Sequence, residues 1–190
     1  MIRSRTIAVT AGFATAGLAG ALGLSLWLAG HGGATATRPH PVWTEVSWPF
    51  PMDEWGQGKA YRCRAADCGT EVDVYVRAKI GFCNCLTGVA DDIELERLSD
   101  FALVGGQVAA LGAGQPVKVG WMKGRSRAYE ISDSARGGKS ALSVAFNNDC
   151  DALVATAVMA RERQTETEPQ VIRFLNGTAV LQWARVTLGL

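Results

Sequence analysis

The sequence predicts an α+β fold, in which an N-terminal transmembrane helix or signal anchor precedes one domain with a mainly antiparallel sheet and two packed helices. Three observations support this prediction. Residues 71–80 alternate between apolar and polar side chains, residues 141–159 have the pattern of two strands around an Asn-Asp turn, and residues 7–30 form a long apolar run. The connections between the predicted strands are short, which favours hairpins and therefore antiparallel pairing.

The N-terminal apolar segment, from Ile7 to Gly30, contains no charged side chain and follows a short head, residues 1–6, that carries Arg3 and Arg5. Spanning a bilayer takes about 20 apolar residues, so the segment is long enough to be an anchor. Because the arginines lie on the short N-terminal side, the positive-inside rule places the rest of the chain outside the cytoplasm.

A linker separates this segment from the predicted domain. Residues 31–41 are small, polar and interrupted by proline, and residues 42–190 form the domain. Ala34-Thr35-Ala36 has the small-x-small form that signal peptidase cleaves, so a retained anchor and cleavage after Ala36 both stay open.

The domain contains two predicted strands near its beginning, at 59–64 and 71–80, with a turn at 65–69. In the second strand we expect one face to be buried and the other to be in water, because the residue types alternate with period two. The apolar set is Val72, Val74, Val76, Ala78 and Ile80, and the polar set is Glu71, Asp73, Tyr75, Arg77 and Lys79.

The middle of the chain predicts a helix and then a hairpin. Residues 90–102 look helical, with three acidic residues in the first turn, where the helix dipole favours negative charge. Residues 117–131 alternate on both sides of Lys123-Gly124-Arg125, which predicts a hairpin that turns at this glycine.

The C-terminal third predicts a second hairpin and a final helix. The hairpin has arms at 141–146 and 152–159, joined by an Asn-Asn-Asp turn. Residues 161–168 are charged, and the helix is expected to begin at Pro169, since the first turn of a helix tolerates proline. It then carries an apolar stripe to the C-terminus.

Charge and histidine content exclude several function classes. The formal net charge is +1, and lysine and arginine are scattered, so no basic face for nucleic acid is expected. The two histidines, His31 and His40, both lie in the linker. The domain therefore has no imidazole for a catalytic triad or for a His-containing metal site, and no cofactor is predicted.

Five cysteines are the candidate site residues, and outside the cytoplasm such a set favours disulfides. Cys63 and Cys68 bracket a turn, close enough for a local bridge. Either Cys83 or Cys85 is then expected to reach Cys150 in the second hairpin, which leaves one cysteine unpaired.

Two other interpretations of the cysteines stay open. A thiolate metal site that uses four of them is disfavoured, because an extended strand separates Cys68 from Cys83 by roughly 30 Å. A redox role would use Cys83 and Cys85 as an exchange pair before a helix N-terminus, where a thiolate is favoured.

Several runs of the sequence resemble single-anchor envelope proteins of α-proteobacteria, whose function is unknown. These runs are residues 48–56 (Trp-Pro-Phe-Pro-Met-Asp-Glu-Trp-Gly), 58–63, 81–85 and 121–125. The resemblance implies a bacterial protein anchored in the inner membrane, with its domain in the periplasm, and implies nothing about activity. In the order of its elements alone, the domain is similar to the small α/β/α sandwiches of the PsbP kind.

We therefore expect a non-enzymatic, membrane-anchored periplasmic module that is stabilised by disulfides and acts through an unidentified protein partner. The alternative is a thiol-redox or metal-handling accessory factor that uses Cys83 and Cys85.

Overall fold

The computed structural model describes residues 41–81, 84–132 and 138–190. All of them belong to the second of the two compact units into which the chain divides, Pro39–Leu190. The apolar segment from Ile7 to Gly30 lies outside the described residues. Within those residues, no helix is both long enough and apolar enough to cross a membrane.

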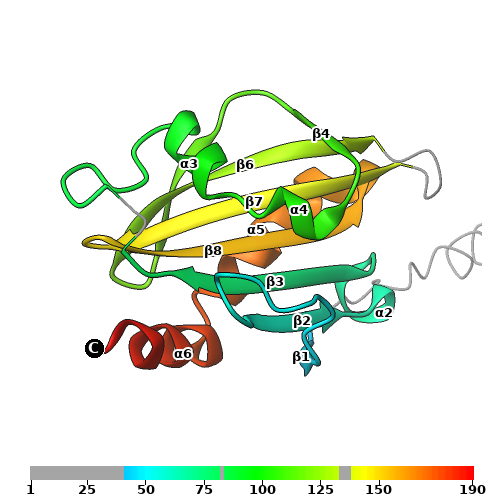
Figure 1. Cartoon of the computed structure of the whole chain (residues 1–190). Helices are drawn as coiled ribbons and strands as arrows, with labels where there is room; N and C mark the ends of the chain where they lie inside the picture. The colour runs from blue at the N-terminus through cyan, green and yellow to red at the C-terminus, as the bar shows by residue number, and fades with distance from the viewer. Residues whose placement is uncertain (1–40, 82–83, 133–137) are drawn as a thin grey trace, which may run out of the picture. The chain divides into compact units, whose positions relative to one another are not determined.

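One antiparallel sheet organises the described part of the chain (Figure 1). Its strands follow the order β1-β2-β3-β8-β7-β6-β4, and β5 pairs with the other half of β6. The strands are β1 (Trp43–Val46), β2 (Lys59–Cys63), β3 (Val72–Lys79), β4 (Gln107–Ala110), β5 (Gln115–Val119), β6 (Met122–Ser132), β7 (Lys139–Asn148) and β8 (Asp151–Ala160).

Helices lie on both faces of the sheet (Figure 1). The short helices α3 (Asp92–Leu98) and α4 (Phe101–Val104) lie on one face, which we call the α3 face. The longer helices α5 (Gln164–Leu175) and α6 (Thr178–Leu188) lie on the opposite face, the α5 face. A single turn, α2 (Ala65–Cys68), joins β2 to β3, and the 3-10 turn η1 (Arg161–Arg163) joins β8 to α5.

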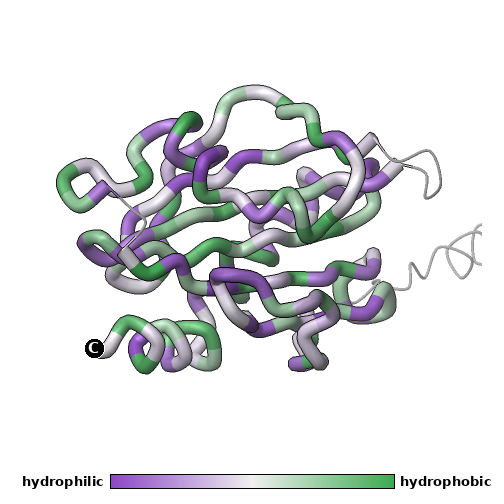
Figure 2. The backbone as a smooth tube through the Cα atoms, viewed as in Figure 1, coloured by the Kyte–Doolittle hydropathy of each residue, from purple (hydrophilic) through white to green (hydrophobic). Residues whose placement is uncertain are grey.

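The main hydrophobic core lies on the α5 face, where alternate residues of β3, β7 and β8 contact the inner sides of the two helices. Figure 2 shows the apolar character of the central strand β8. The residues of this core that are at most 1% exposed include Val72, Val74, Val76, Leu142, Val144, Phe146, Leu153, Ala155, Ala157, Met159, Val171, Leu175, Val180 and Ala184.

A second, smaller apolar cluster lies on the α3 face. Its buried members are Val89, Leu95, Leu98, Ala145, Ala152 and Val154. The sheet therefore buries side chains on both faces, but far more of them under α5 and α6.

The α+β class and the mainly antiparallel sheet are confirmed. The second hairpin agrees with its prediction, since β7 and β8 pair from Lys139 with Ala160 down to Asn148 with Asp151. The predicted acidic start of the 90–102 helix is also present, because the Glu94 N–H donates to the Asp91 side chain at 2.9 Å and caps α3.

The turn of the first hairpin is not where the sequence predicts it. The chain reverses between β5 and β6 at Gly120, whose φ of 60° suits a turn, and not at Lys123-Gly124-Arg125. Gly124 lies inside β6, where a Cβ atom would come within 2.1 Å of the carbonyl oxygen of Ala145. This glycine permits a close backbone approach between β6 and β7.

The predicted helix boundaries also need correction. The 90–102 segment is two helices, because the chain is extended at Ser99, where the hydroxyl donates to the Leu95 carbonyl oxygen at 2.7 Å. The last helix begins at Gln164, which places Pro169 inside α5 on its exposed side, and it breaks before α6. At that break, Asn176 accepts a hydrogen bond from the Gly120 N–H at 2.8 Å.

Candidate functional site

Two disulfide bonds are present, and the first lies in the main core. Cys63, at the end of β2, pairs with Cys68, at the end of α2, and their Cα atoms are 6.0 Å apart. The two residues are 0% and 4% exposed. This bridge holds the turn between β2 and β3 against the α5 face, as the spacing of these two cysteines predicts.

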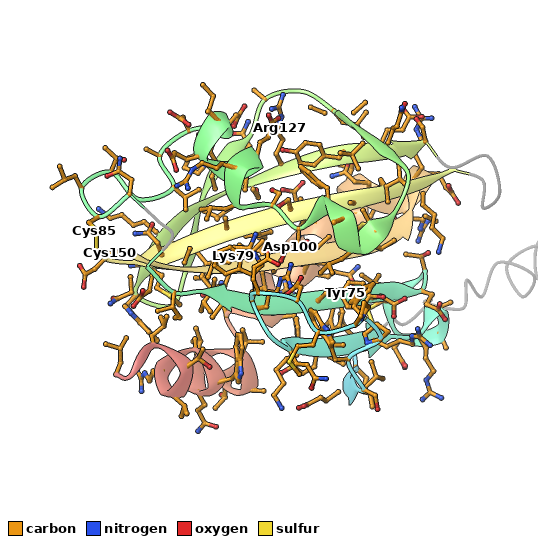
Figure 3. The ribbon with its side chains drawn as sticks, viewed as in Figure 1. Tyr75, Lys79, Cys85, Asp100, Arg127 and Cys150 are labelled. Atoms are coloured by element: carbon orange, nitrogen blue, oxygen red, sulfur yellow. A yellow bond between two sulfur atoms is a disulfide. The ribbon has the colours of Figure 1, made fainter. Side chains whose placement is uncertain are left out.

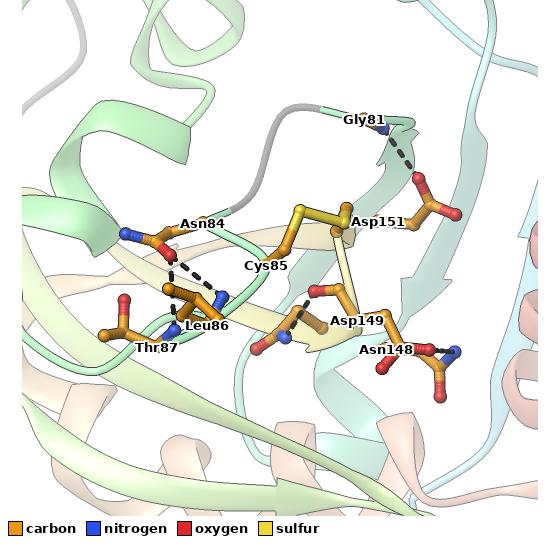
Figure 4. The surroundings of a disulfide bond; sticks show 10 residues. Gly81, Asn84, Cys85, Leu86, Thr87, Asn148, Asp149 and Asp151 are labelled. Atoms are coloured by element: carbon orange, nitrogen blue, oxygen red, sulfur yellow. Dashed lines mark hydrogen bonds between the residues drawn. A yellow bond between two sulfur atoms is a disulfide. The ribbon is translucent and has the colours of Figure 1, made fainter.

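The second disulfide lies at the surface and joins Cys85 to Cys150 (Figures 3 and 4). Cys85 is exposed and Cys150 is half-buried. The bridge connects the loop that precedes α3 with the tip of the β7–β8 hairpin, across 65 residues of sequence. Beside it, the Gly81 N–H donates to the Asp151 carboxylate at 2.6 Å.

The remaining predicted site residues lie outside the described residues. These are Cys83, and the anchor from Ile7 to Gly30. Because Cys85 takes Cys150 as its partner, the choice between Cys83 and Cys85 that the sequence left open falls to Cys85. In the part of the chain that the structure describes, no group of three or more His, Cys, Asp or Glu side chains is placed to hold a metal ion.

The polar face of β3 is buried near its end, which corrects the prediction of a face in water. Arg77 is 4% exposed and Lys79 is 5% exposed. Two segments cover them. One is residues 47–58 between β1 and β2, which we call the strap, and the other is residues 84–104, which include α3 and α4 and which we call the covering segment (Figure 1). Periodicity predicts which side chains share a face, but it does not predict what covers that face.

Asp100, between α3 and α4, pairs with both buried cations (Figure 3). Arg77 donates from Nε and Nη2 to the two carboxylate oxygens of Asp100, at 2.6 and 2.7 Å. The Lys79 Nζ lies 2.8 Å from the same carboxylate, which belongs to a residue only 5% exposed. Bidentate pairing of this kind offsets much of the cost of removing the charges from water.

Asp53 brings a second carboxylate to Arg77 from the strap. Arg77 Nη1 donates to both oxygens of Asp53, at 2.8 and 2.6 Å. The Lys79 Nζ also lies 5.1 Å from the ring centroid of Trp55, in a cation–π contact. Two cations and two carboxylates thus form one ion network, which links both covering segments to β3.

The network shifts the pKa values of Arg77 and Asp53. Burial alone would lower the pKa of Arg77, but hydrogen bonds to Asp100 and Asp53 outweigh it and raise the pKa above its ordinary value. The hydrogen bond from Arg77 also lowers the pKa of Asp53, against a smaller opposing effect of desolvation. Each of these two shifts stabilises the charged form, so Arg77 and Asp53 are held ionised.

Aromatic contacts hold the first part of the strap on β3. The rings of Trp48 and Phe50 pack edge-on against Tyr75, with centroids 6.1 and 4.8 Å away. Burial raises the pKa of Tyr75. Trp48 also packs over Gly58, where a Cβ atom would lie 2.8 Å from the indole ring. The strap is therefore fixed by ring packing in its first part and by Asp53 near its middle.

A separate set of ion pairs holds α3 on β6. Arg125 pairs with Asp92, and Arg127 Nη1 lies 2.7 Å from a carboxylate oxygen of Glu96. The hydrogen bond from Arg125 lowers the pKa of Asp92. These pairs are partly exposed, so they contribute less than the buried network around Asp100.

The sequence reasoning missed the network of Arg77, Lys79, Asp53 and Asp100. Its only local signal is a pair of cations two residues apart on one strand face, and a strand facing water has the same pattern. The four formal charges neutralise one another, so the arrangement fixes segments in place and offers no free acid or base.

No protein-family model matches this chain, and no curated protein matches it significantly. The fold and the site define its class: a disulfide-stabilised α+β domain in which buried ion pairs hold two segments over one face of the sheet.

Proposed function

We propose that this protein is a membrane-anchored envelope module, in which a disulfide-stabilised domain acts in the periplasm through a protein partner. The observation that carries the proposal is the Cys63–Cys68 bridge. Structural disulfides form and persist outside the reducing cytoplasm. This bridge lies within the main core, so it belongs to the folded state of the domain.

The N-terminal sequence supports the same location. The uncharged run from Ile7 to Gly30 follows a short head with two arginines, which favours an inner-membrane anchor with the domain outside the cytoplasm. Cleavage after Ala36 would release the same domain into the periplasm. The resemblance to α-proteobacterial envelope proteins and the PsbP-like order of elements are consistent with this module.

We propose a binding module and not an enzyme because the buried charged residues of the domain pair with one another. The domain sequence contains no histidine. The most buried charged side chains, Arg77, Lys79 and Asp100, neutralise one another together with Asp53. Acid–base catalysis needs a group that is free to exchange a proton with substrate, and each of these groups is engaged in an ion pair instead.

A topology and thiol experiment tests the proposal. Alkaline phosphatase fused after Leu190 should be active in cells that express the full chain, and inactive when residues 1–36 are deleted. Intact mass of the membrane-derived protein, alkylated without reduction, should show two protected cysteine pairs and should also show whether residues 1–36 are still attached. An inactive full-length fusion, or four freely alkylated thiols, would contradict the proposal.

The alternative function is a thiol-redox or metal-handling accessory factor, and the exposure of Cys85 favours it. If it holds, Cys83→Ser and Cys85→Ser should each abolish disulfide exchange or metal uptake while the circular dichroism spectrum stays unchanged. Full activity of both variants would eliminate this alternative.

A further inference from the structure

We propose that Cys85–Cys150 is a redox-exchangeable bridge: an external thiol opens it while Cys63–Cys68 stays closed, and its opening releases residues 84–90, the beginning of the covering segment, from the α3 face. This inference goes beyond the proposed function, which requires only that both bridges form.

The two bridges differ in access to an attacking thiol. Exchange requires a thiolate to approach one sulfur directly, so the exposure of the bridge limits the rate. Cys63 and Cys68 are 0% and 4% exposed, inside the core under α5 and α6. Cys85 is an exposed residue, and the next residue, Leu86, is 96% exposed. A reductant therefore reaches Cys85 without unfolding the domain.

The segment that this bridge holds has little apolar burial of its own. The smaller cluster on the α3 face contains six buried residues of the described chain, against nineteen in the main core. The covering segment supplies three of those six: Val89, Leu95 and Leu98. Local opening requires least free energy where few apolar contacts are lost, so this segment opens before the sheet or α5 does.

Once the bridge is broken, few contacts hold the beginning of the covering segment. The Val89 N–H donates to the Asn147 side chain at 3.2 Å. Before the segment, the Gly81 N–H donates to the Asp151 carboxylate (Figure 4). The far end stays attached through Asp100 and its buried cations. The helix α3 also stays attached to β6, through the Arg125–Asp92 and Arg127–Glu96 pairs. Opening is therefore a swing of residues 84–90, with α3 as the fixed end.

The reaction is ordinary thiol–disulfide exchange with an external dithiol. A thiolate of the dithiol attacks Cys85 Sγ, a new S–S bond forms there, and the old bond breaks with its electron pair on Cys150 Sγ, which takes a proton from water. The second thiol of the dithiol then displaces Cys85 as a thiol. The protein gains two thiols, and the dithiol becomes a disulfide.

The charges around the bridge select the reductant. Asp149 and Asp151 flank Cys150 in the sequence, and Asp149 is exposed at the hairpin tip. Their carboxylates repel an anionic thiol. They attract a thiol that lies on a positively charged surface, and this attraction raises the local concentration of that thiol at the bridge. The partner that fits is a dithiol protein with basic residues around its reactive cysteine.

The test uses the full chain in detergent, oxidised and with free thiols blocked by N-ethylmaleimide. The protein is reduced for timed intervals with cysteamine, a cationic thiol, or with 2-mercaptoethanesulfonate, an anionic thiol. Each reaction is quenched in acid, the newly formed cysteine thiols are labelled with a second reagent, and the labelled cysteines are identified by peptide mass. The rate constant for each thiol is divided by the rate constant with which the same thiol reduces hydroxyethyl disulfide, which removes the difference in intrinsic reactivity between the two thiols. We expect Cys85 and Cys150 to open at least about tenfold faster than Cys63 and Cys68.

Two further results complete the test. The normalised rate at Cys85–Cys150 should be higher with cysteamine, and Asp149→Asn should reduce that preference. Amide exchange in residues 84–90 should become faster after selective reduction and in a Cys85→Ala/Cys150→Ala variant, but not in Cys63→Ala/Cys68→Ala. Equal opening rates of the two bridges, no preference between the thiols, or unchanged amide exchange would each overturn the proposal.

Discussion

Arg77 and Asp100 form a bidentate ion pair between β3 and the link from α3 to α4, with N–O distances of 2.6 and 2.7 Å. The remaining nitrogen of the same guanidinium reaches Asp53 in the strap. One side chain of β3 therefore joins a segment 24 residues upstream to another 23 residues downstream. The position of both segments over the α3 face depends on this arginine.

Replacing Asp100 by asparagine should strongly destabilise the domain. The variant leaves Arg77 and Lys79 buried with only Asp53 to balance two positive charges. Loss of one partner from a buried pair costs about 3–5 kcal/mol, and we expect the free energy of unfolding in urea to fall by that amount. Reversible denaturation, followed by circular dichroism and by tryptophan fluorescence, measures it.

The matched control is Asp67→Asn. Asp67 pairs with Arg64 at 3.7 Å, and the Arg64 side chain is 80% exposed. Such a surface pair contributes about 0–1 kcal/mol. If Asp100→Asn were as mild as this control, the network would not be what holds the covering segment.

The acid dependence of stability should include a contribution from Asp53. In the folded state, the hydrogen bond from Arg77 lowers its pKa below the ordinary aspartate value of 3.8. Below that value the unfolded chain binds a proton that the folded protein does not, so stability is lost as the pH falls through the folded pKa. Between pH 2 and 5, Asp53→Asn should make the free energy of unfolding depend less steeply on pH than in the natural chain. Equal slopes would show that the Arg77–Asp53 pair is not formed in solution.

Local pattern was enough to predict much of the sheet. The alternation in β3 gave the side chains that share the α5 face, except Ile80, which lies beyond the strand and is 55% exposed. The apolar arms around Asn148 and Asp149 gave the β7–β8 hairpin. Both features depend on neighbours in sequence, and a two-residue period or an Asn-Asp turn is visible there.

The burial of Arg77 and Lys79 was not predictable, because local pattern contains only neighbours in sequence. Arg77 and Lys79 are buried only because Asp53 and Asp100, each more than 20 residues away, come to lie over them. The prediction of a turn at Gly124 is wrong for a related reason. The missing side chain of Gly124 allows β7 to approach closely, and β7 is distant in sequence.

Gly124→Ala should therefore destabilise the sheet, although alanine is otherwise compatible with a strand. A Cβ atom at this position would meet backbone and Cβ atoms of Ala145 and Phe146 at 2.1–2.7 Å, and a paired strand cannot easily move away. Overpacking typically costs about 1–3 kcal/mol, and we expect the upper end of that range in urea unfolding. Lys123→Ala, at the exposed neighbouring residue, should change stability by less than about 0.5 kcal/mol. Similar values for the two variants would mean that β6 and β7 are not packed this closely.

The Cys85–Cys150 bridge should stabilise the domain mainly through the unfolded state, because it closes a long loop at the protein surface. With a sequence separation of 65, loop-closure entropy predicts a contribution of about 4 kcal/mol. The double variant Cys85→Ala/Cys150→Ala should lose roughly this much unfolding free energy and should keep the near-ultraviolet circular dichroism of the folded protein. Leu86→Ala is the control, since it changes an exposed side chain of the same loop and should cost less than about 0.5 kcal/mol. A double variant as stable as this control would mean that the bridge does not restrict the unfolded chain, and a loss of native circular dichroism would mean that it is needed to form the fold itself.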